Sequence, residues 1–204
     1  ITTNMGGEGS LLDVPINKQV DIDGVKIFYF KVKIFMRWAF CPSMKKRLNE
    51  ELEDADFIFS HFHYQYPSVI AGRYARKKNI PLIVFSHGSL NKYGIRQRKY
   101  LLKHLYINIF ESKNLLFSKF IAFNCEEEKS ISLFKENGRV IYNGISLEQF
   151  KNLPNKGFYR DKIENKKDKL IFLFLGRLNY TQKGINKLIP AFKRLTTNNK
   201  LVHL

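Results

Sequence analysis

The sequence has few of the residues that define several common protein classes. Its only two cysteines, Cys41 and Cys125, lie far apart and form no CxxC pair. That spacing argues against a disulfide framework or a structural zinc site, and it favours a reducing, cytoplasmic compartment. The longest apolar runs are about six residues, far short of the roughly 20 that cross a bilayer. We therefore expect a protein without membrane spans.

Acidic residues are also scarce, with 18 Asp and Glu against 35 Lys and Arg in 204 residues, a net charge of +17. This balance favours polyanions such as nucleic acid, an anionic membrane surface or phosphorylated substrates. A basic surface that is only solvated is an alternative, because no basic block exceeds a few residues. The RRM, KH and helix-turn-helix signatures are missing. We therefore expect no nucleic-acid partner, although a basic nucleic-acid-binding protein stays open as an alternative function.

Apolar residues, by contrast, are plentiful. Hydrophobic residues make up 44% of the chain and aromatic residues 14%, which predicts a globular protein. Short apolar runs alternate with segments of helical periodicity, a pattern typical of an α/β fold with a parallel sheet covered by helices. The expected strands are 25–30, 56–60, 81–86, 120–123 and 139–142, and the expected helical segments are 42–52, 67–78, 96–117 and 125–136.

The clearest such unit is Lys169–Leu195. Its apolar run Leu170–Leu175 predicts a strand buried on both faces, and from Ile185 onward apolar residues recur at helical spacing. The loop between them carries Gly176, Arg177 and Lys183. Its glycines match neither a dinucleotide-binding GxGxxG nor a P-loop.

Anion binding is the chemistry that suits this loop. Loops at the carboxyl ends of parallel strands open into the ligand crevice, and the next helix directs its N-terminal amides there. Arg177 offers a planar fork for phosphate oxygens, and Lys183 adds a mobile point charge. The alternative is that both are ordinary solvated residues.

Histidines follow two of the expected strands. His61 and His63 come after the strand at 56–60, and His87-Gly88 follows the strand at 81–86. Histidines at this edge of a sheet face the ligand crevice, although a capping or core-edge histidine is an alternative for His87. We predict no metal site, because the His61/His63 pair lacks a third ligand with suitable spacing. The acidic pair at 21 and 23 precedes a glycine and favours a turn.

Several segments together resemble a known family. The segment GRLNYTQKGINKLIPAF at 176–192 resembles the opening of the C-terminal domain of family 4 glycosyltransferases, and VIYNGISLEQF at 140–150 resembles the segment that closes their N-terminal domain. Weaker likenesses are IPLIVFSHGSLN at 80–91, KFIAFNCEEE at 119–128 and the histidines after residue 60. Cys125 and Ser146 depart from the family's usual Ser and Asp.

The resemblance implies a retaining enzyme of the GT-B fold that uses a nucleotide sugar and needs no metal or other cofactor. It implies that Arg177, Lys183 and Gly176 hold the donor diphosphate, and that His87 contacts the transferred sugar or polarises the reacting centre. The residues that it places on the sugar and acceptor side are Gly88, His61, His63, Asn143 and Gly144.

The resemblance also implies a domain organisation. We expect an acceptor-side Rossmann-like domain at 1–150 without its first strand, a linker at 151–168, and the start of a nucleotide-sugar-binding Rossmann-like domain at 169–204. The chain would then be truncated at both ends, and a non-catalytic, transferase-like module is an alternative. The expected acceptor is a polysaccharide, a glycolipid or a lipid-linked glycan.

A basic cluster in the first domain predicts attachment to an anionic membrane, at its cytoplasmic face. Lysines and arginines are interleaved there with tyrosines, which favour the membrane interface. The cluster comprises Arg73, Arg76, Lys77, Lys78, Lys92, Arg96, Arg98, Lys99 and Lys103, with Tyr74, Tyr93 and Tyr100.

Overall fold

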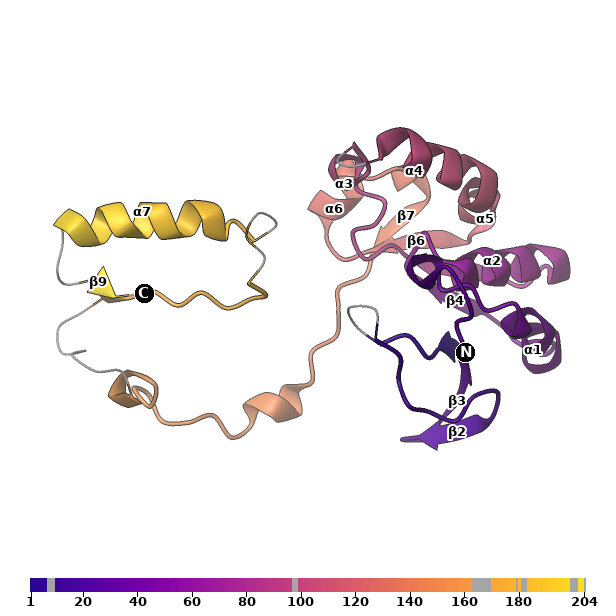
Figure 1. Ribbon diagram of the computed structural model, residues 1–204, viewed down its shortest axis with the longest axis horizontal. Helices are drawn as coiled ribbons and strands as arrows, with labels where there is room; N and C mark the ends of the chain where they lie inside the picture. Colours follow the sequence, from indigo (N-terminus) through magenta and orange to yellow (C-terminus); the bar gives the residue numbers. More distant parts are fainter. Residues whose placement is uncertain are drawn as a thin grey trace. The chain divides into compact units, whose positions relative to one another are not determined.

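The chain forms two compact units, Ile1–Gly144 and Ile145–Leu204. The computed structural model describes residues 1–6, 10–96, 99–162, 170–178, 180, 183–198 and 202–203 (Figure 1). The first unit ends shortly before residue 150, where the sequence predicts the end of the first domain.

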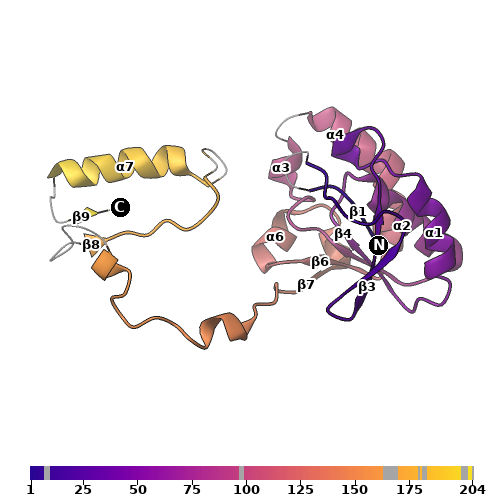
Figure 2. The ribbon, with the colours of Figure 1, turned by 60° about the horizontal axis from the view of Figure 1, so that its bottom comes forward.

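A four-stranded parallel sheet forms the centre of the first unit, and this confirms the α/β fold class. Its strands pair in chain order, which requires each connection to cross over the sheet (Figure 2). They are β4 (Ile58–His61), β5 (Leu82–Phe85), β6 (Phe120–Phe123) and β7 (Gly138–Val140). All four fall where apolar runs predict strands.

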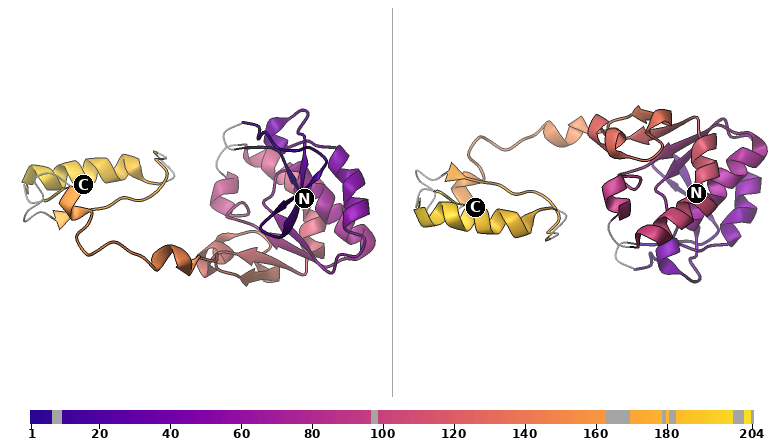
Figure 3. Two further views of the ribbon diagram at one scale, coloured as in Figure 1. Left: turned by 90° about the horizontal axis from the view of Figure 1, so that it is seen from below. Right: turned by 90° about the horizontal axis from the view of Figure 1, so that it is seen from above.

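Helices cover this sheet (Figure 3). Because parallel crossovers are right-handed, strands that pair in chain order place their connecting helices on one face. Accordingly α2 packs against β4, and α1 and α5 contact α2. The helices are α1 (Ser43–Glu51), α2 (Tyr66–Lys78), α3 (Lys92–Arg96), α4 (Tyr100–Tyr106), α5 (Ser112–Phe117) and α6 (Glu126–Ile131).

Two helical segments differ in detail from their predictions. Residues 100–117 are helical as expected, but the π-helix η3 (Ile107–Glu111) separates α4 from α5. The helix predicted at 125–136 ends early, because Ser132 is extended, and a 3-10 turn η4 (Lys135–Asn137) follows. Ser68 of α2 donates to Glu111 in the π-helix, and where α6 ends the Leu133 amide donates to the Leu90 carbonyl of another segment.

A smaller sheet precedes β4. It joins β1 (Thr2–Thr3), β3 (Val25–Phe30) and β2 (Gln19–Ile22) in that order, and the 3-10 turn η2 (Met36–Trp38) leads on to α1. Asp23 and Gly24 both have positive φ angles, 53° and 78°, as a tight hairpin turn requires. The Gly24 amide also donates to Asp21 Oδ1 at 3.0 Å. The predicted turn is confirmed.

The core lies between the parallel sheet and its helices. Ile121 and Phe123 of β6 are fully buried, and Leu82 of β5 and Leu115 of α5 are almost so. They belong to one continuous cluster that also includes Phe30 of the smaller sheet. The two sheets of the first unit therefore share a core.

The described residues of the second unit form one parallel β-α-β motif. It is built from β8 (Leu170–Ile171), α7 (Ile185–Asn198) and β9 (Val202–His203). Two 3-10 turns, η5 (Leu147–Phe150) and η6 (Arg160–Lys162), precede it. The motif confirms the predicted strand–loop–helix, while residues 163–168 of the predicted linker lie outside the described part of the chain.

The predicted burial of Leu170–Leu175 is wrong. The strand ends at Ile171, and Leu173 and Leu175 expose 85% and 91% of their surface. One helix can cover only one side of such a segment, here through the contact of Phe172 with Phe192 of α7. Among the described residues of this unit, no second layer covers the opposite side.

The packing of α2 on α5 depends on Gly72. A Cβ at this position would lie 2.4 Å from the side chain of Asn114, which is itself buried and accepts a hydrogen bond from Arg76 Nε at 3.0 Å. We expect Gly72→Ala to lower the free energy of unfolding by about 1–3 kcal/mol through overpacking. Chemical denaturation measures this loss.

The matched control is Gly94→Ala in α3, where a Cβ would meet nothing within 4 Å. This change should be neutral or stabilising by about 0.5–1 kcal/mol, because alanine restricts the unfolded chain and favours helix. Equal effects of the two substitutions would contradict the proposed role of Gly72.

Candidate active site

Two histidines meet at the carboxyl edge of the parallel sheet. His61 is the last residue of β4, and His87 lies two residues beyond the end of β5. His61 Nδ1 lies 2.9 Å from His87 Nε2, and the rings stack with centroids 5.2 Å apart. Parallel pairing of β4 with β5 brings the two residues together, since it aligns His61 with Phe85.

Aromatic rings surround the pair. Phe85 stacks on His61 at 4.7 Å, and Phe62 lies 4.6 Å from the ring of His87. Partial burial lowers the pKa of His61, and the neighbouring His87 lowers it further by charge repulsion. With neutral imidazoles, one ring donates the shared hydrogen and the other accepts it. The remaining ring nitrogens can then donate a hydrogen bond to a ligand or accept one from it.

The loop that carries His87 has an uncommon backbone. His87 and Gly88 both have positive φ angles, 46° and 79°. The left-handed region suits glycine, and histidine is among the residues that tolerate it. A conformation of this kind persists only where surrounding contacts fix it.

Glu128 of α6 provides those contacts. Its Oε1 accepts hydrogen bonds from Ser86 Oγ at 2.6 Å and from the Gly88 amide at 2.7 Å. Its Oε2 accepts from the Asn124 amide at 2.8 Å. The carboxylate thus ties the loop after β5 to the loop after β6, on either side of His87.

Sequence reasoning assigned no role to Glu128. A signal was present, because an acidic residue at the third position of a helix commonly reaches back to amides before the helix. Cys125 is the N-cap of α6, and its sulfur accepts from the Glu128 amide at 3.4 Å. The neighbouring Glu126 and Glu127 are exposed, so the sequence alone could not single out Glu128.

His63 differs from His61 and His87 in being buried. It is only 5% exposed, and neither ring nitrogen has a hydrogen-bond partner among the described residues. Burial, helped by the charge of His87, lowers the pKa of His63 to about 4. His63 is therefore a neutral, buried side chain at neutral pH, whereas His61 is exposed.

A buried carboxyl group lies deeper in the same unit. Glu111 ends the π-helix η3, is 2% exposed and accepts from Ser68 Oγ at 2.9 Å. Burial raises its pKa to about 7, although Ser68 and the charge of Arg73 oppose the shift. π-Helical turns often occur at functional sites. No sequence pattern distinguished Glu111, because its burial depends on α2.

The remaining predicted site residues lie elsewhere. Asn143 and Gly144 are exposed and follow β7 at the end of the first unit. Gly176, Arg177 and Lys183 belong to the second unit and are also exposed.

The loop of the second unit leads directly into α7. Gly184 has a φ of 70°, and its carbonyl accepts from the amides of Lys187 and Leu188, both at 2.9 Å. The helix therefore begins at Ile185, two residues after Lys183. Arg177 follows β8 at a distance of several residues rather than at its end, because the strand is shorter than predicted.

Two other features are absent from the described residues. No group of three or more His, Cys, Asp or Glu side chains there could hold a metal ion. No described helix combines the length and the apolar character that a membrane crossing needs.

Comparison with known proteins identifies the family. The sequence profile of Glycosyltransferase Family 4 matches residues 7–149, which is more than half of the chain. The chain therefore belongs to this glycosyltransferase family. No curated protein sequence matches it.

Solved structures with a similar fold are distant in sequence. HepE from Anabaena, solved with UDP-glucose, is 14% identical with a TM-score of 0.48 over 88% of this chain and 55% of its own. A putative UDP-N-acetylglucosamine 2-epimerase from Listeria monocytogenes is 12% identical with a TM-score of 0.48, over 87% and 47%. MnaA from S. aureus, solved with UDP, is 15% identical with a TM-score of 0.43, over 85% and 46%. The chain thus spans about half the length of these proteins.

The lowered pKa of His63 predicts a pH-dependent stability. A histidine with a pKa of about 4 when folded and 6.5 when unfolded takes up its proton mainly on unfolding. Its contribution to stability is complete above pH 6.5 and is lost as the pH falls toward 4. Relative to His63→Leu, the wild type should lose about 3 kcal/mol of unfolding free energy across that range.

Denaturant titrations at a series of pH values measure this difference. His104→Gln serves as the control, since His104 is a half-buried histidine on α4. Its substitution should leave the wild-type pH dependence unchanged. A constant difference between wild type and His63→Leu from pH 4 to 6.5 would refute the assignment.

Proposed function

We propose that the protein is a retaining glycosyltransferase that moves a sugar from a nucleotide sugar to a polysaccharide, glycolipid or lipid-linked acceptor. The proposal rests on the family 4 match, which covers most of the first unit. In that unit, His61 and His87 lie in contact at the carboxyl edge of the parallel sheet. Such an edge is where α/β proteins bind ligands. The chain covers 55% and 47% of two solved structures of similar fold.

His87 is the catalytic residue in this proposal. Its ring would contact the transferred sugar or polarise the reacting centre, and His61 would fix its tautomer through the shared hydrogen bond. Gly88 lacks a side chain, so the backbone can approach a sugar closely. His63, Asn143 and Gly144 complete the proposed sugar and acceptor side, His63 acting from its buried position beneath the edge.

The donor diphosphate would bind to the loop before α7. Arg177 and Lys183 are exposed cations there, and the loop leads into a helix N-terminus, which favours anions. Gly176 would let the backbone approach the diphosphate. These cations would stabilise the charge that develops on the leaving group, so the transfer would need no metal.

Arg177→Ala should lower turnover more than it weakens donor binding, because the charge on the diphosphate grows in the transition state. Loss of one preorganised charge-stabilising group typically costs about 100- to 1000-fold in rate. The measurement is steady-state kinetics of the full-length protein, with the donor chosen from a panel of nucleotide sugars by turnover. Arg177→Lys should restore little, since a point charge cannot replace the guanidinium fork.

Lys187→Ala is the matched control, because Lys187 is an exposed cation on α7 outside this loop. Lys183→Ala should act in the same direction as Arg177→Ala, and the double variant should show less than the sum of both effects. Near-normal turnover in Arg177→Ala would remove the proposed donor site. Absence of turnover with every nucleotide sugar would remove the proposed function.

We also propose that the first unit attaches to an anionic membrane surface at its cytoplasmic side. The helical segment from α4 to α5 exposes an apolar row flanked by Arg96, Lys99 and Lys103. An amphipathic helix of this kind can lie in the plane of a membrane interface. The row consists of Leu101, Leu102, Leu105, Ile109 and Leu116, which are 56–79% exposed.

Of the three tyrosines in the predicted basic cluster, two are exposed and one is buried. Tyr93 and Tyr100 are 71% and 43% exposed, so both can reach an interface. Tyr74 is only 6% exposed, and its predicted place in the cluster is wrong. It packs in the core of the first unit because α2 turns this residue toward α1 and the sheet. Arg98 lies outside the described residues.

Vesicle cosedimentation tests this surface. The wild type should bind vesicles that contain phosphatidylserine and should not bind phosphatidylcholine vesicles, since each cation near an anionic surface contributes about 1 kcal/mol. The double variant Leu101→Ser/Leu105→Ser should bind at least about tenfold more weakly, because it removes two apolar anchors. Val25→Ser, at an exposed apolar residue of β3, is the control and should bind as the wild type does. Equal binding to both vesicle types would contradict the proposal.

A further inference from the structure

A second candidate binding site lies between α1 and α2. The two helices run side by side, and a cavity of about 210 Å³ opens between them. Leu48 of α1 and Ile70 of α2 supply its apolar lining. We call this cavity the α1–α2 groove.

Three cations line the groove. Lys45 comes from α1, and Arg73 and Lys77 come from α2, where their spacing of four residues places them on one face. None of the lining side chains is a carboxylate. Among the described residues, none of the three cations has an acidic partner within 4 Å.

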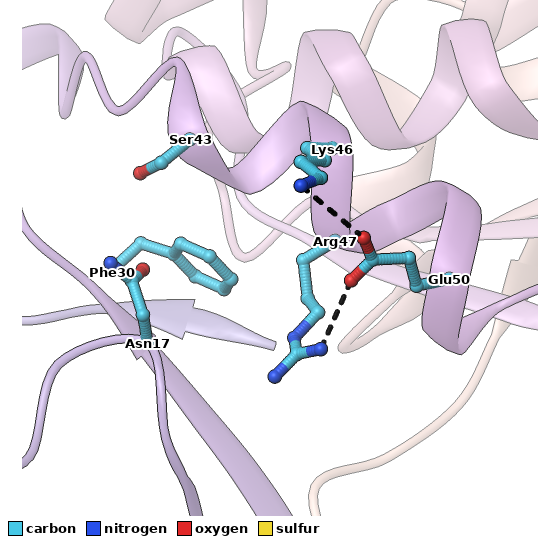
Figure 4. A pocket seen from close by; sticks show the side chains of 6 residues that line it. All are labelled: Asn17, Phe30, Ser43, Lys46, Arg47 and Glu50. Carbon is cyan, nitrogen blue, oxygen red and sulfur yellow. Dashed lines mark hydrogen bonds and ion pairs between the residues drawn. The ribbon is translucent and has the colours of Figure 1, made fainter.

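Two other cations of α1, Lys46 and Arg47, do have an acidic partner. In Figure 4, Arg47 and Lys46 both point to Glu50, at 3.0 and 4.0 Å, beside the neighbouring pocket lined by Phe30. α1 therefore carries acids that pair with cations on its other side, while its groove side has none. Arg73 does sense the charge of the buried Glu111, which does not line the groove.

A buried phenol adds an independent observation. Tyr74 lines the groove, is 6% exposed, and its hydroxyl has no hydrogen-bond partner among the described residues. A buried hydroxyl without a partner destabilises a protein, unless a ligand supplies that partner. Tyr66 and Asn49 bring two further polar groups to the same groove.

We propose that the α1–α2 groove binds a phosphoryl group with two negative charges, such as that of a phosphate monoester. A compact dianion can offer acceptor oxygens to an arginine fork, to two ammonium groups and to the Tyr74 hydroxyl together. The groove uses none of the residues assigned to sugar transfer. It is a second ligand site, beyond sugar transfer, and its Arg73 and Lys77 also belong to the basic cluster predicted to contact a membrane.

Titration of the full-length protein with inorganic phosphate, followed by calorimetry at constant ionic strength, tests the site. We expect saturable binding, because Lys45, Arg73 and Lys77 line one cavity whose lining has no carboxylate. The double variant Lys45→Gln/Lys77→Gln should weaken it about tenfold or more, in line with charged hydrogen bonds elsewhere. Lys26→Gln/Lys113→Gln removes the same charge from exposed positions outside the groove and should bind as the wild type does.

Tyr74→Phe provides a test that does not depend on charge. Removing the unpartnered hydroxyl should keep or raise the melting temperature without phosphate, and it should reduce the increase that phosphate produces in the wild type. A lowered melting temperature without phosphate would show that the hydroxyl already has a partner, and this would overturn the role given to Tyr74.

Vesicles distinguish a free ligand from a lipid headgroup. Binding of inorganic phosphate that the Lys45→Gln/Lys77→Gln variant loses would identify a soluble phosphoryl ligand. A preference for phosphatidate-containing over phosphatidylserine-containing vesicles, lost in the same variant and kept in Leu101→Ser/Leu105→Ser, would identify a lipid phosphomonoester. If neither probe binds, or if the control pair loses as much as the groove pair, the groove is not a phosphoryl site.

Discussion

The candidate active site depends on a single carboxylate. Glu128 accepts three hydrogen bonds, from Ser86, Gly88 and Asn124, and so joins the loops after β5 and β6. Between two of these contacts, His87 adopts a left-handed backbone that it would not keep by itself. The contact between His87 and His61 therefore depends on the hydrogen bonds that Glu128 of α6 accepts from Ser86 and Gly88.

The parallel sheet supplies the rest of the geometry. Because β4 and β5 pair in parallel, their carboxyl ends bring His61 and His87 to one edge. Helix α2 approaches α5 closely at Gly72, where an added Cβ would lie 2.4 Å from the Asn114 side chain. Any shift of α2 would also move the π-helical turn, since Ser68 of α2 donates to Glu111. Packing against α5 and the hydrogen bond to buried Glu111 thus involve the same helix.

The basic residues of α1 and α2 differ in whether an acidic side chain lies next to them. Lys46 and Arg47 of α1 have acidic partners on Glu50, whereas Lys45, Arg73 and Lys77 converge on a groove that has none. Clustered cations without acids raise the local potential, and this favours compact anions over diffuse solvation. Three of the cations that contribute to the net charge of +17 therefore lie around one groove.

The sequence by itself determined the class of fold and its order of elements. Apolar runs and helical periodicity located β4 to β7, α1, α2 and the β-α-β motif around α7, because local patterning fixes which segments can bury a face. Segments such as 140–150 and 176–192 also carried the family resemblance, which the profile match over 7–149 supports for the first unit. The histidines at 61, 63 and 87 were recognisable as candidates from their positions after strands.

Tertiary structure alone decided which of these residues are accessible and what holds them. His61 is exposed and His63 is buried although they are two residues apart, and Glu128 is engaged while Glu126 and Glu127 face solvent. Tertiary packing likewise buries Tyr74, and it leaves Leu173 and Leu175 exposed. The physical reason is that burial and hydrogen-bond partners come from segments distant in sequence, so a local pattern predicts an element but not its neighbours.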